Sequence, residues 1–599
     1  MKNIIFKITI FTLALGFMTS CTDEMKRDFL EQENPNEATT DNFWRDLGET
    51  QKGLYSVYKT LYDPSTFNIP EEMLRSDMGY PSLNRPTPAS PSPFYIHTYS
   101  ETSDEVNEKW QSNYLGIFRA NQVIEALERI QTNTDINQEE WTSQMAQARF
   151  FRGLFHYYLY TTYNNGSIII RNKVPTNREE YELPLSSAAD VLTFIREDLE
   201  YAYANLYKKG EYPDNDISKV TAGAAAMVLG NSYLNELKYT EASAYYEDVI
   251  NNHGYELVTD LDLMFTTAGE FNDESIFEVN FTADNINLNF APWDGGTGTS
   301  ILALYTRGNT STTAAGPAWI AYEFKNEPKD PLDDRNYYID PADNTKKLRN
   351  VPLRASSMMA IVEDYQTLYY QAPTTEVTGP AFNGRAWGGF AYWKKYTNHD
   401  IVAAERDIPN GVAYSAKNLT VIRLAEAILN LAECKIKTNK IDEALGLINQ
   451  IRKRWGLVLL GPSNGDTSRT YDEEVYTQTS LMDRFMKIEK PLELGAEGHA
   501  MRWIDFIRWK KSDNYGFKER LQELSDLTLY GVNYSYTDNE GVAKTKQNFP
   551  SLTDTAPADI NQAEVVDYEY DLANSNYTDA LNSYYPIPSR EKNANGNID

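Results

Sequence analysis

Two pairs of helix-periodic segments in this 599-residue chain share the same internal spacing. In the first pair Gly230 is followed twelve residues later by Ala242, and in the second Ala432 is followed twelve residues later by Ala444. Large residues then recur at matching distances: Tyr246 and Val249 in one pair, Ile448 and Ile451 in the other. This pattern is typical of tetratricopeptide-type helical hairpins, in which a small residue on one helix lets the next helix pack closely. The alternative, generic packing of two helical hairpins, would keep nearly the same geometry.

Helical periodicity covers residues 105–255 and 418–456, so we expect the helical repeat units there. Between them, residues 260–417 form a loop-rich insert in which Gly, Pro, Asn and Thr cluster, although Ser275–Val279 has the character of a strand. The C-terminal region, residues 480–599, is expected to be loop-rich from residue 515 onward. Loops this long in a compact protein are usually functional or disordered. The sequence therefore predicts a mainly α fold, with a tetratricopeptide-like scaffold carrying a loop-rich irregular face.

The first 20 residues have the layout of a secretory signal peptide. Lys2 and Lys7 precede the apolar run Ile8–Phe17, which is too short to span a membrane, and small polar residues follow. Cys21 comes next, as in a bacterial lipoprotein box, so we expect cleavage before Cys21 and lipidation of its thiol. The alternative is a plain signal peptide followed by an incidental cysteine.

Cysteine usage favours the lipoprotein interpretation, because the chain has two cysteines and the second, Cys434, lies in an apolar helical stretch. Two cysteines so far apart do not provide a disulfide framework. We expect residues 21–40 to be a polar tether held at the outer membrane by lipid on Cys21. Residues 41–599 are expected to form a single folded domain.

Composition and motifs exclude several classes of function. Asp and Glu outnumber Lys and Arg by 86 to 56, and a net charge of −30 disfavours nucleic acid as a partner. None of the five histidines stands in an HExxH motif, and no phosphate-binding loop, dinucleotide fingerprint or GxSxG elbow occurs. Acidic pairs are so frequent that they carry no information about glycosidase chemistry. We expect a binding protein rather than an enzyme, with no catalytic residue, no metal site and no cofactor.

Several segments along the chain carry motifs that occur together in one protein family. They are Asp28–Glu31 with Thr39–Trp44, Arg119–Ile124, Ala148–Gly153, Ile422–Glu433 with Asn449–Arg454, Glu489–Trp509, and Tyr585–Glu591. In this combination and order they resemble the SusD/RagB family of outer-membrane nutrient-binding lipoproteins of Bacteroidetes-type bacteria. Two details depart from the usual pattern: Gly498 and Arg502 are two residues further apart, and Asn593–Gly596 matches the usual Asn-Pro-Asn ending only loosely.

The resemblance implies a helical fold with four tetratricopeptide-like units and a loop-rich side that carries the ligand site. It also implies a partner, a SusC-like TonB-dependent β-barrel transporter, over which the lipoprotein acts as a hinged lid facing the cell exterior. The leading hypothesis is a cell-surface glycan-binding lipoprotein that delivers oligo- or polysaccharide to this transporter. A peptide-binding lid of the same family is the alternative, and a secreted glycosidase is a third possibility that no motif supports.

Many of the charged residues in these motifs are expected to be scaffold rather than ligand residues. They have the pattern of partly buried charge networks that hold helices together. The set comprises Arg119, Arg149, Arg152, Arg423, Glu426, Glu497, Arg502 and Asp505.

Two chain regions are predicted to build the ligand site. The first, residues 77–99, corresponds in position to the part of the family that contributes ligand contacts, and its five prolines fix loop shape. Its candidates are Asp77, Tyr80, Arg85, Tyr95 and Tyr99. The second is the Gly-rich segment after residue 290, with Trp293, Asp294, Tyr305 and Arg307, and with Trp387 as an outlying candidate.

Aromatic rings suit a sugar because they stack on its apolar C–H face while planar polar groups bond its hydroxyl rim. Trp293 stands between Pro292 and Gly295, a setting that does not serve an amphipathic helix face. For each single ring, local packing remains the competing interpretation. Trp319 and Trp393 are expected to pack within an ordinary helix and strand.

Overall fold

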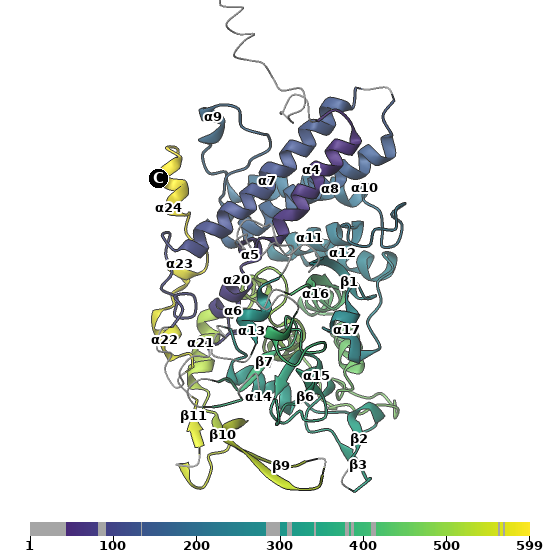
Figure 1. Ribbon diagram of the computed structural model, residues 1–599, viewed down its shortest axis with the longest axis vertical. Coiled ribbons are helices and arrows are strands. Elements are labelled where there is room, and N and C mark those ends of the chain that lie inside the picture. Colours follow the sequence, from purple (N-terminus) through teal and green to yellow (C-terminus); the bar gives the residue numbers. More distant parts are fainter. Residues whose placement is uncertain are drawn as a thin grey trace, which may run out of the picture.

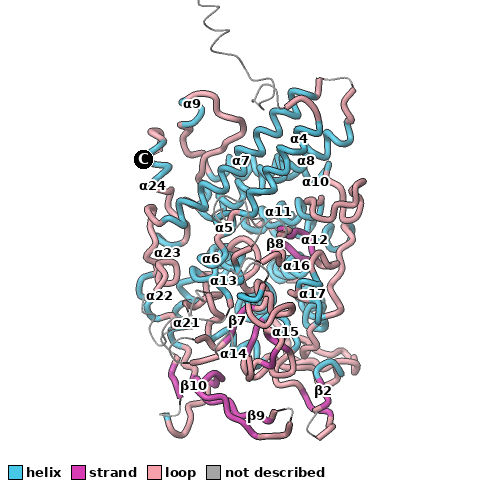
Figure 2. The backbone as a smooth tube through the Cα atoms, in the orientation of Figure 1, coloured by secondary structure: helices cyan, strands magenta, loops and turns pink. Residues whose placement is uncertain are grey.

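The computed structural model describes residues 44–81, 91–132, 135–282, 300–307, 314–340, 343–377, 382–384, 388–408, 415–538, 540–560, 563–566 and 569–598. The expected signal peptide, tether and lipidation site Cys21 lie outside these residues, as do Arg85, Trp293, Asp294 and Trp387. The described part is mainly helical, and its long helices gather toward one end of the molecule while loops and strands dominate the other (Figure 2). The predicted fold class, a helical scaffold with an irregular loop-rich part, is confirmed.

Four long helices form one end of the molecule (Figure 1). They are α4 (Leu47–Lys59), α7 (Asp104–Ile130), α8 (Gln138–Thr162) and α10 (Ala188–Asn205). Side chains cap their starts: Asn137 accepts hydrogen bonds from the first N–H groups of α8, and Ser187 accepts one from the N–H of Asp190 in α10. Two short helices, α5 (Pro64–Phe67) and α6 (Ile69–Arg75), connect α4 toward the loop-rich part.

Two helical hairpins follow the spacing found in the sequence. The first pairs α11 (Ala222–Asn235) with α12 (Tyr239–Asn252), the second pairs α16 (Leu424–Lys437) with α17 (Ile441–Arg454), and α12 packs against α16. A Cβ placed on Gly230 would lie 2.7 Å from the ring of Tyr246, so glycine is what permits this close approach. The tetratricopeptide-like packing is therefore confirmed at the contact that predicted it.

The remaining helices are mostly short, apart from the 13-residue α20, and lie mostly in the second half of the chain. They are α9 (Arg178–Tyr181), α13 (Leu302–Thr306), α14 (Ala318–Asn326), α15 (Leu353–Met358), α18 (Gln478–Arg484), the π-helical turn η8 (Phe485–Glu489), α19 (Lys490–Leu494), α20 (Met501–Asp513), α21 (Phe517–Asp526), α22 (Asp571–Asn576), α23 (Asp579–Asn582) and α24 (Ser589–Ala594). Single 3-10 turns are η1 (Thr60–Tyr62), η2 (Asn164–Gly166), η3 (Leu261–Leu263), η4 (Thr267–Gly269), η6 (Asp334–Asn336) and η7 (Glu405–Asp407).

The strands form small antiparallel sheets. β1 (Ser275–Val279), the predicted strand, pairs with β8 (Leu419–Arg423), which leads directly into α16. Other pairs are β2 (Tyr337–Ile339) with β3 (Lys346–Leu348), β4 (Met359–Ile361) with β7 (Ala391–Trp393), and β5 (Leu368–Tyr369) with β6 (Ala372–Pro373). A three-stranded sheet has the order β10 (Ala543–Thr553), β9 (Tyr530–Thr537), β11 (Ala563–Val565).

This three-stranded sheet corrects the expectation that residues 515–599 are loop-rich. Val532, Tyr534 and Tyr536 alternate along β9, which is a strand pattern of period two. The turn into β10 is closed by the side chain of Asp538, which accepts the N–H groups of Glu540 and Val542 at 3.0 and 2.8 Å. The sequence signal was therefore present, although polar residues between the tyrosines weakened it.

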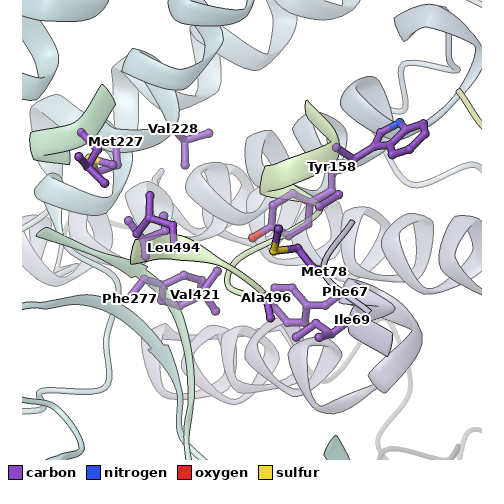
Figure 3. Close-up of a cluster of buried hydrophobic side chains, with 14 of the residues drawn as sticks. Phe67, Ile69, Met78, Tyr158, Met227, Val228, Phe277, Val421, Leu494 and Ala496 are labelled. Carbon is purple, nitrogen blue, oxygen red and sulfur yellow. The ribbon is translucent and has the colours of Figure 1, made fainter. Parts of the chain in front are cut away.

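One large apolar core joins the helical and irregular parts. In Figure 3, Phe67 of α5, Tyr158 of α8, Phe277 of β1, Val421 of β8 and Leu494 of α19 gather in one cluster. A smaller, separate cluster forms within the insert from Tyr369, Tyr370, Phe382 and Tyr392 with other buried residues. Because the large core draws on segments from both ends of the chain, burial of apolar surface fixes the insert against the helices.

Buried ion pairs between segments distant in sequence add to this core. Arg423 donates to Glu497 at 2.6 Å, to Glu274 at 2.6 Å and to Glu493 at 2.8 Å, and all four side chains are nearly fully buried. The guanidinium thus ties β8 to the start of β1 and to α19. Breaking such a pair leaves an uncompensated buried charge, which is why the network specifies one arrangement of these segments.

The other predicted scaffold charges behave in the same way. Arg149 and Arg152 of α8 both bond Asp198 of α10, each at 2.7 Å. Asp505 pairs with Lys490 and Arg508, and Glu426 accepts a hydrogen bond from Asn231 at 2.9 Å. Arg119 differs, since its described bond is to the hydroxyl of Thr60 at 3.0 Å. Ion-pair networks are confirmed for Arg149, Arg152, Arg423, Glu497, Arg502 and Asp505, whereas the hydrogen bonds of Arg119 and Glu426 described above are to neutral groups.

Candidate functional site

The two chain regions predicted to build a ligand site meet in the structure. Tyr80 exchanges two backbone hydrogen bonds of 2.9 Å with Ala315. The neighbouring N–H of Ala314 donates to the carbonyl oxygen of Tyr305 at 3.2 Å, which brings α13 beside the first region. Gly316 then donates to Ala391 of β7 at 3.0 Å. These backbone bonds place residues from three distant parts of the chain side by side.

A second backbone pairing lies at the other end of α13. Ser300 and Ser415 exchange hydrogen bonds of 2.7 and 2.8 Å, and the Ser415 hydroxyl donates to Asn398 at 2.8 Å. We call the residues united by these pairings the junction: Tyr80, Ser300–Arg307, Ala314–Gly316, Gly389–Ala391 and Ser415. The junction borders five of the segments outside the described residues, those beginning at 82, 283, 308, 385 and 409.

Tyr305 and Arg307 are the predicted candidates that lie at the junction with half-buried side chains. The N–H of Arg307 donates to the carbonyl of Ala303 at 3.0 Å and so ends α13. An apolar cavity of about 30 Å³ lies at the start of α13, lined in part by Leu302, Tyr62 and Phe281. The rings of Tyr62 and Phe281 lie 5.4 Å apart.

Tyr62 is a lining residue that sequence reasoning missed. It follows α4 in a stretch with helical periodicity, so nothing in the sequence distinguished it from a packing residue. Its ring is half-buried, and burial raises the pKa of its phenol above the ordinary value, which keeps the hydroxyl neutral.

Asp77 requires a correction, because its carboxylate is fully buried and held by two arginines. Arg502 donates two hydrogen bonds to it at 2.8 and 2.9 Å, and Arg520 donates a third at 2.9 Å. Burial alone would raise the pKa of Asp77, but the two guanidinium groups outweigh burial and hold that pKa below its usual range. Asp77 is therefore a structural counter-ion for α20 and α21 and offers no free oxygen to a ligand.

The tyrosines predicted in the first region are also packing residues. Tyr80 and Tyr95 are almost fully buried with their rings 5.5 Å apart, edge to face. Tyr99 is 8% exposed, stacks on Phe94 at 5.1 Å and donates its hydroxyl to the carbonyl of Asn582 at 2.8 Å. Their polar tips and apolar faces are used inside the protein, so these side chains are not presented at a surface.

The segment that holds Asp77 is fixed by the two tryptophans that were expected to pack. The indole N–H of Trp319 in α14 donates to the carbonyl of Asp77 at 2.7 Å, and that of Trp393 in β7 donates to Met78 at 3.1 Å. Both rings are buried. The packing interpretation of Trp319 and Trp393 is confirmed. Their bonds to Asp77 and Met78 fix the backbone just before Tyr80, which belongs to the junction.

The remaining candidates, Arg85, Trp293, Asp294 and Trp387, belong to segments that border the junction and lie outside the described residues. Across the part of the chain that the structure describes, no group of three or more His, Cys, Asp and Glu side chains is arranged to hold a metal ion. Among the same described residues, no helix has the length and apolar character needed to cross a membrane.

Family models match most of the chain. The model described as the SusD family matches residues 274–599, and one described as "Starch-binding associating with outer membrane" matches residues 28–234. SusD-like protein P25 of Formosa agariphila is 22% identical over 499 residues, which cover 80% of this chain and 86% of that protein.

Solved structures show the same fold. A SusD-like carbohydrate-binding protein from Bacteroides fragilis superposes with a TM-score of 0.65 at 17% identity, covering 93% of this chain and 100% of that one. A laminarin-binding SusD-like protein gives a TM-score of 0.62 at 17% identity, covering 93% of this chain and 99% of that one.

Proposed function

The chain belongs to the SusD family, and on that premise we propose that it is a glycan-binding lipoprotein of the cell surface that hands its ligand to an outer-membrane transporter. The observation that carries the proposal is the match of residues 28–234 to a family described by starch binding and association with the outer membrane. The carbohydrate and laminarin binding named for two structural neighbours supports the same class of ligand. Binding, rather than turnover, is the proposed activity.

We place the glycan site at the junction and the segments that border it. The half-buried side chains of Tyr305 and Arg307 supply an aromatic ring and planar hydrogen-bond donors there. Tyr62 supplies aromatic surface in the cavity that Ser300 and Leu302 also line. Trp293, from the bordering segment, is the ring proposed to stack on the sugar. The other sequence candidates in these segments, Asp294, Arg85 and Trp387, are proposed to contribute polar and aromatic contacts.

Titration calorimetry against laminarin, starch and a mixed peptide library tests ligand class and site together. Trp293→Ala and Tyr305→Ala are each expected to weaken glycan binding by about tenfold, or about 1.4 kcal/mol, with little loss of thermal stability. Tyr55→Ala is the matched control, since Tyr55 of α4 is 57% exposed and belongs neither to the junction nor to the lining of the cavity at the start of α13. Unchanged affinity in both junction variants would show that the site is misplaced. Binding of peptides alone would favour the peptide-binding alternative, and hydrolysis of a bound oligosaccharide would favour the glycosidase.

The proposed partner is a SusC-like TonB-dependent β-barrel transporter, an inference that rests on the family alone. Gentle detergent extraction of membranes, followed by affinity purification of the tagged protein, is expected to recover a large β-barrel protein. Recovery of the monomer alone in several detergents would contradict this partner.

Membrane attachment through Cys21 is proposed from the apolar run that precedes this residue. Cys21→Ala is expected to move the protein from the membrane fraction to the soluble fraction while leaving its thermal unfolding unchanged, because only the acyl chains are lost. If Cys21→Ala remains in the membrane fraction, the lipid anchor is wrong and another attachment must hold the protein.

A further inference from the structure

A second cavity, of about 130 Å³, lies away from the junction, where the α10–α11 connection meets β1. Its lining residues come from residues 209–221, from Tyr255 and Phe271, and from β1. None of them belongs to the junction or to the cavity beside it. At about 10–15 Å³ for each water position, this space holds roughly ten waters, which a single six-membered sugar ring would displace.

Aromatic rings form the fixed walls of this cavity. Tyr255 is 5% exposed, and its hydroxyl is within 2.7 Å of the Thr221 hydroxyl. A Cβ on Gly223 would lie 2.7 Å from the Tyr255 ring, so helix α11 holds the ring from behind. Tyr212, buried on the other wall, donates its hydroxyl to the carbonyl of Val220 at 2.6 Å. Both rings are therefore already positioned before any ligand arrives.

Polar groups of both charges surround these rings. The Lys209 ammonium donates to the carbonyl of Asp273 at 3.0 Å and lies 5.4 Å from the centre of the Tyr255 ring. Asp216 accepts the N–H and the hydroxyl of Ser218 at 3.0 and 2.6 Å. Lys219 forms an ion pair with Asp214. A charged ligand would have to compete with these internal pairs, whereas hydroxyl groups can share their free lone pairs and protons.

We propose that this cavity is a second carbohydrate site, which holds one neutral pyranose ring independently of the junction. The ring carbons of Tyr255 and Tyr212 that line the cavity provide apolar surface for the sugar's C–H groups, and the Ser218 hydroxyl and the Asp216 carboxylate accept hydrogen bonds from its hydroxyls. A site for one ring is weak, with a Kd on the order of 1 mM, so its use is to hold one end or branch of a longer chain that is bound elsewhere.

Methyl NMR can test this cavity directly because Ile276 of β1 lines it and is 5% exposed. The protein is labelled at isoleucine δ1 methyl groups, the Ile276 signal is assigned from Ile276→Val, and glucose, laminaritriose and glucuronate are titrated in turn. Glucose and laminaritriose are expected to shift the Ile276 signal to saturation. The Kd for glucuronate is expected to be at least about tenfold higher than the Kd for glucose.

Blocking variants separate this site from the junction. Ser218→Trp fills the cavity and is expected to abolish the Ile276 shift, whereas Ser218→Ala, which leaves the space open, retains it. Should Ser218→Trp fail to fold, Ile217→Trp blocks the mouth from a position that is 67% exposed. Three results would overturn the proposal. They are the lack of an Ile276 shift with glucose up to about 50 mM, an Ile276 shift that persists in a folded blocking variant, and tighter binding of glucuronate than of glucose. If Trp293→Ala abolishes polysaccharide binding, glucose is still expected to shift the Ile276 signal. The junction site and this cavity can therefore be disproved independently of each other.

Discussion

Replacing Gly230 by alanine is expected to destabilise the protein, although the same replacement at Gly446 is expected to stabilise it. Both glycines lie inside helices of the two hairpins, Gly230 in α11 and Gly446 in α17. Alanine has a helix propensity about 0.8–1 kcal/mol more favourable than glycine. A Cβ at Gly446 meets no atom within 4 Å, so that site should gain nearly all of this amount.

At Gly230 the same gain is opposed by a clash. The added Cβ would lie 2.7 Å from Cε1 and 3.0 Å from Cζ of Tyr246. That ring is fully buried, and its hydroxyl donates to Asn231 at 2.6 Å, so it cannot move aside without losing a hydrogen bond. Overpacking of this kind costs about 1–3 kcal/mol. Because the propensity gain is common to both sites, the two variants should differ by about 1–3 kcal/mol, with Gly230→Ala the less stable.

Urea unfolding followed by circular dichroism measures this difference as a shift of the midpoint at constant slope. Heat unfolding is less sensitive, since in a chain this long about 2 kcal/mol moves Tm by only about 2 °C. A midpoint for Gly230→Ala equal to or above that of Gly446→Ala would refute the reasoning. The small residue would then not be what allows α11 and α12 to approach, and the tetratricopeptide-like spacing would be coincidental.

Two further predictions concern buried carboxyl groups. Asp77→Asn is expected to lower the free energy of unfolding by about 3–5 kcal/mol, because Arg502 and Arg520 lose their counter-ion. The folded fraction is expected to keep its glycan affinity. Unchanged stability with weakened glycan binding would instead make Asp77 a ligand residue. The pKa of Asp77 is depressed in the folded state, so its contribution is present above about pH 4 and is lost as pH falls through the lowered pKa. Burial raises the pKa of Glu426 to about 7 despite its bond from Asn231, so the folded protein loses stability as pH rises from about 4.5 to about 7. Glu426→Gln is therefore expected to stabilise the protein at pH 8 and to have little effect at pH 4. The gain at pH 8 is at most about 3 kcal/mol, since one pKa unit corresponds to about 1.4 kcal/mol. Equal unfolding midpoints of the variant and the parent at pH 8 would contradict this prediction.

The sequence predicted the scaffold well because its signals are local. The spacing from Gly230 to Tyr246 lies within one hairpin, and the strand pattern of β1 lies within five residues. Trp319 and Trp393 were correctly assigned to packing from their immediate neighbours. The sheet of β9, β10 and β11 was missed because its strands are half-exposed, and the serine and asparagine between the tyrosines resemble loop residues.

The candidate site was harder to predict because burial of a polar residue depends on partners that are distant in sequence. Asp77 and its partners Arg502 and Arg520 are separated by 425 and 443 residues. Seen locally, an aspartate before a proline-rich loop has the same pattern whether it bonds a sugar or an arginine. The tyrosines of that loop were ambiguous for the same reason, since Tyr99 finds its hydrogen-bond acceptor at Asn582.

Main-chain hydrogen bonds, rather than side chains, bring the two predicted regions side by side. Tyr80 pairs with Ala315, and the N–H of Ala314 donates to the carbonyl of Tyr305. Such pairings use main-chain N–H and C=O groups, which every residue except proline offers, so no side-chain pattern encodes them. Gly- and Pro-rich composition therefore indicates which segments leave the scaffold, while the packing of Trp319 and Trp393 beneath Asp77 decides where those segments meet. Mutagenesis for ligand residues in this chain should accordingly begin at Tyr305, Arg307 and the segments that border the junction, rather than at the buried Tyr80, Tyr95 and Tyr99.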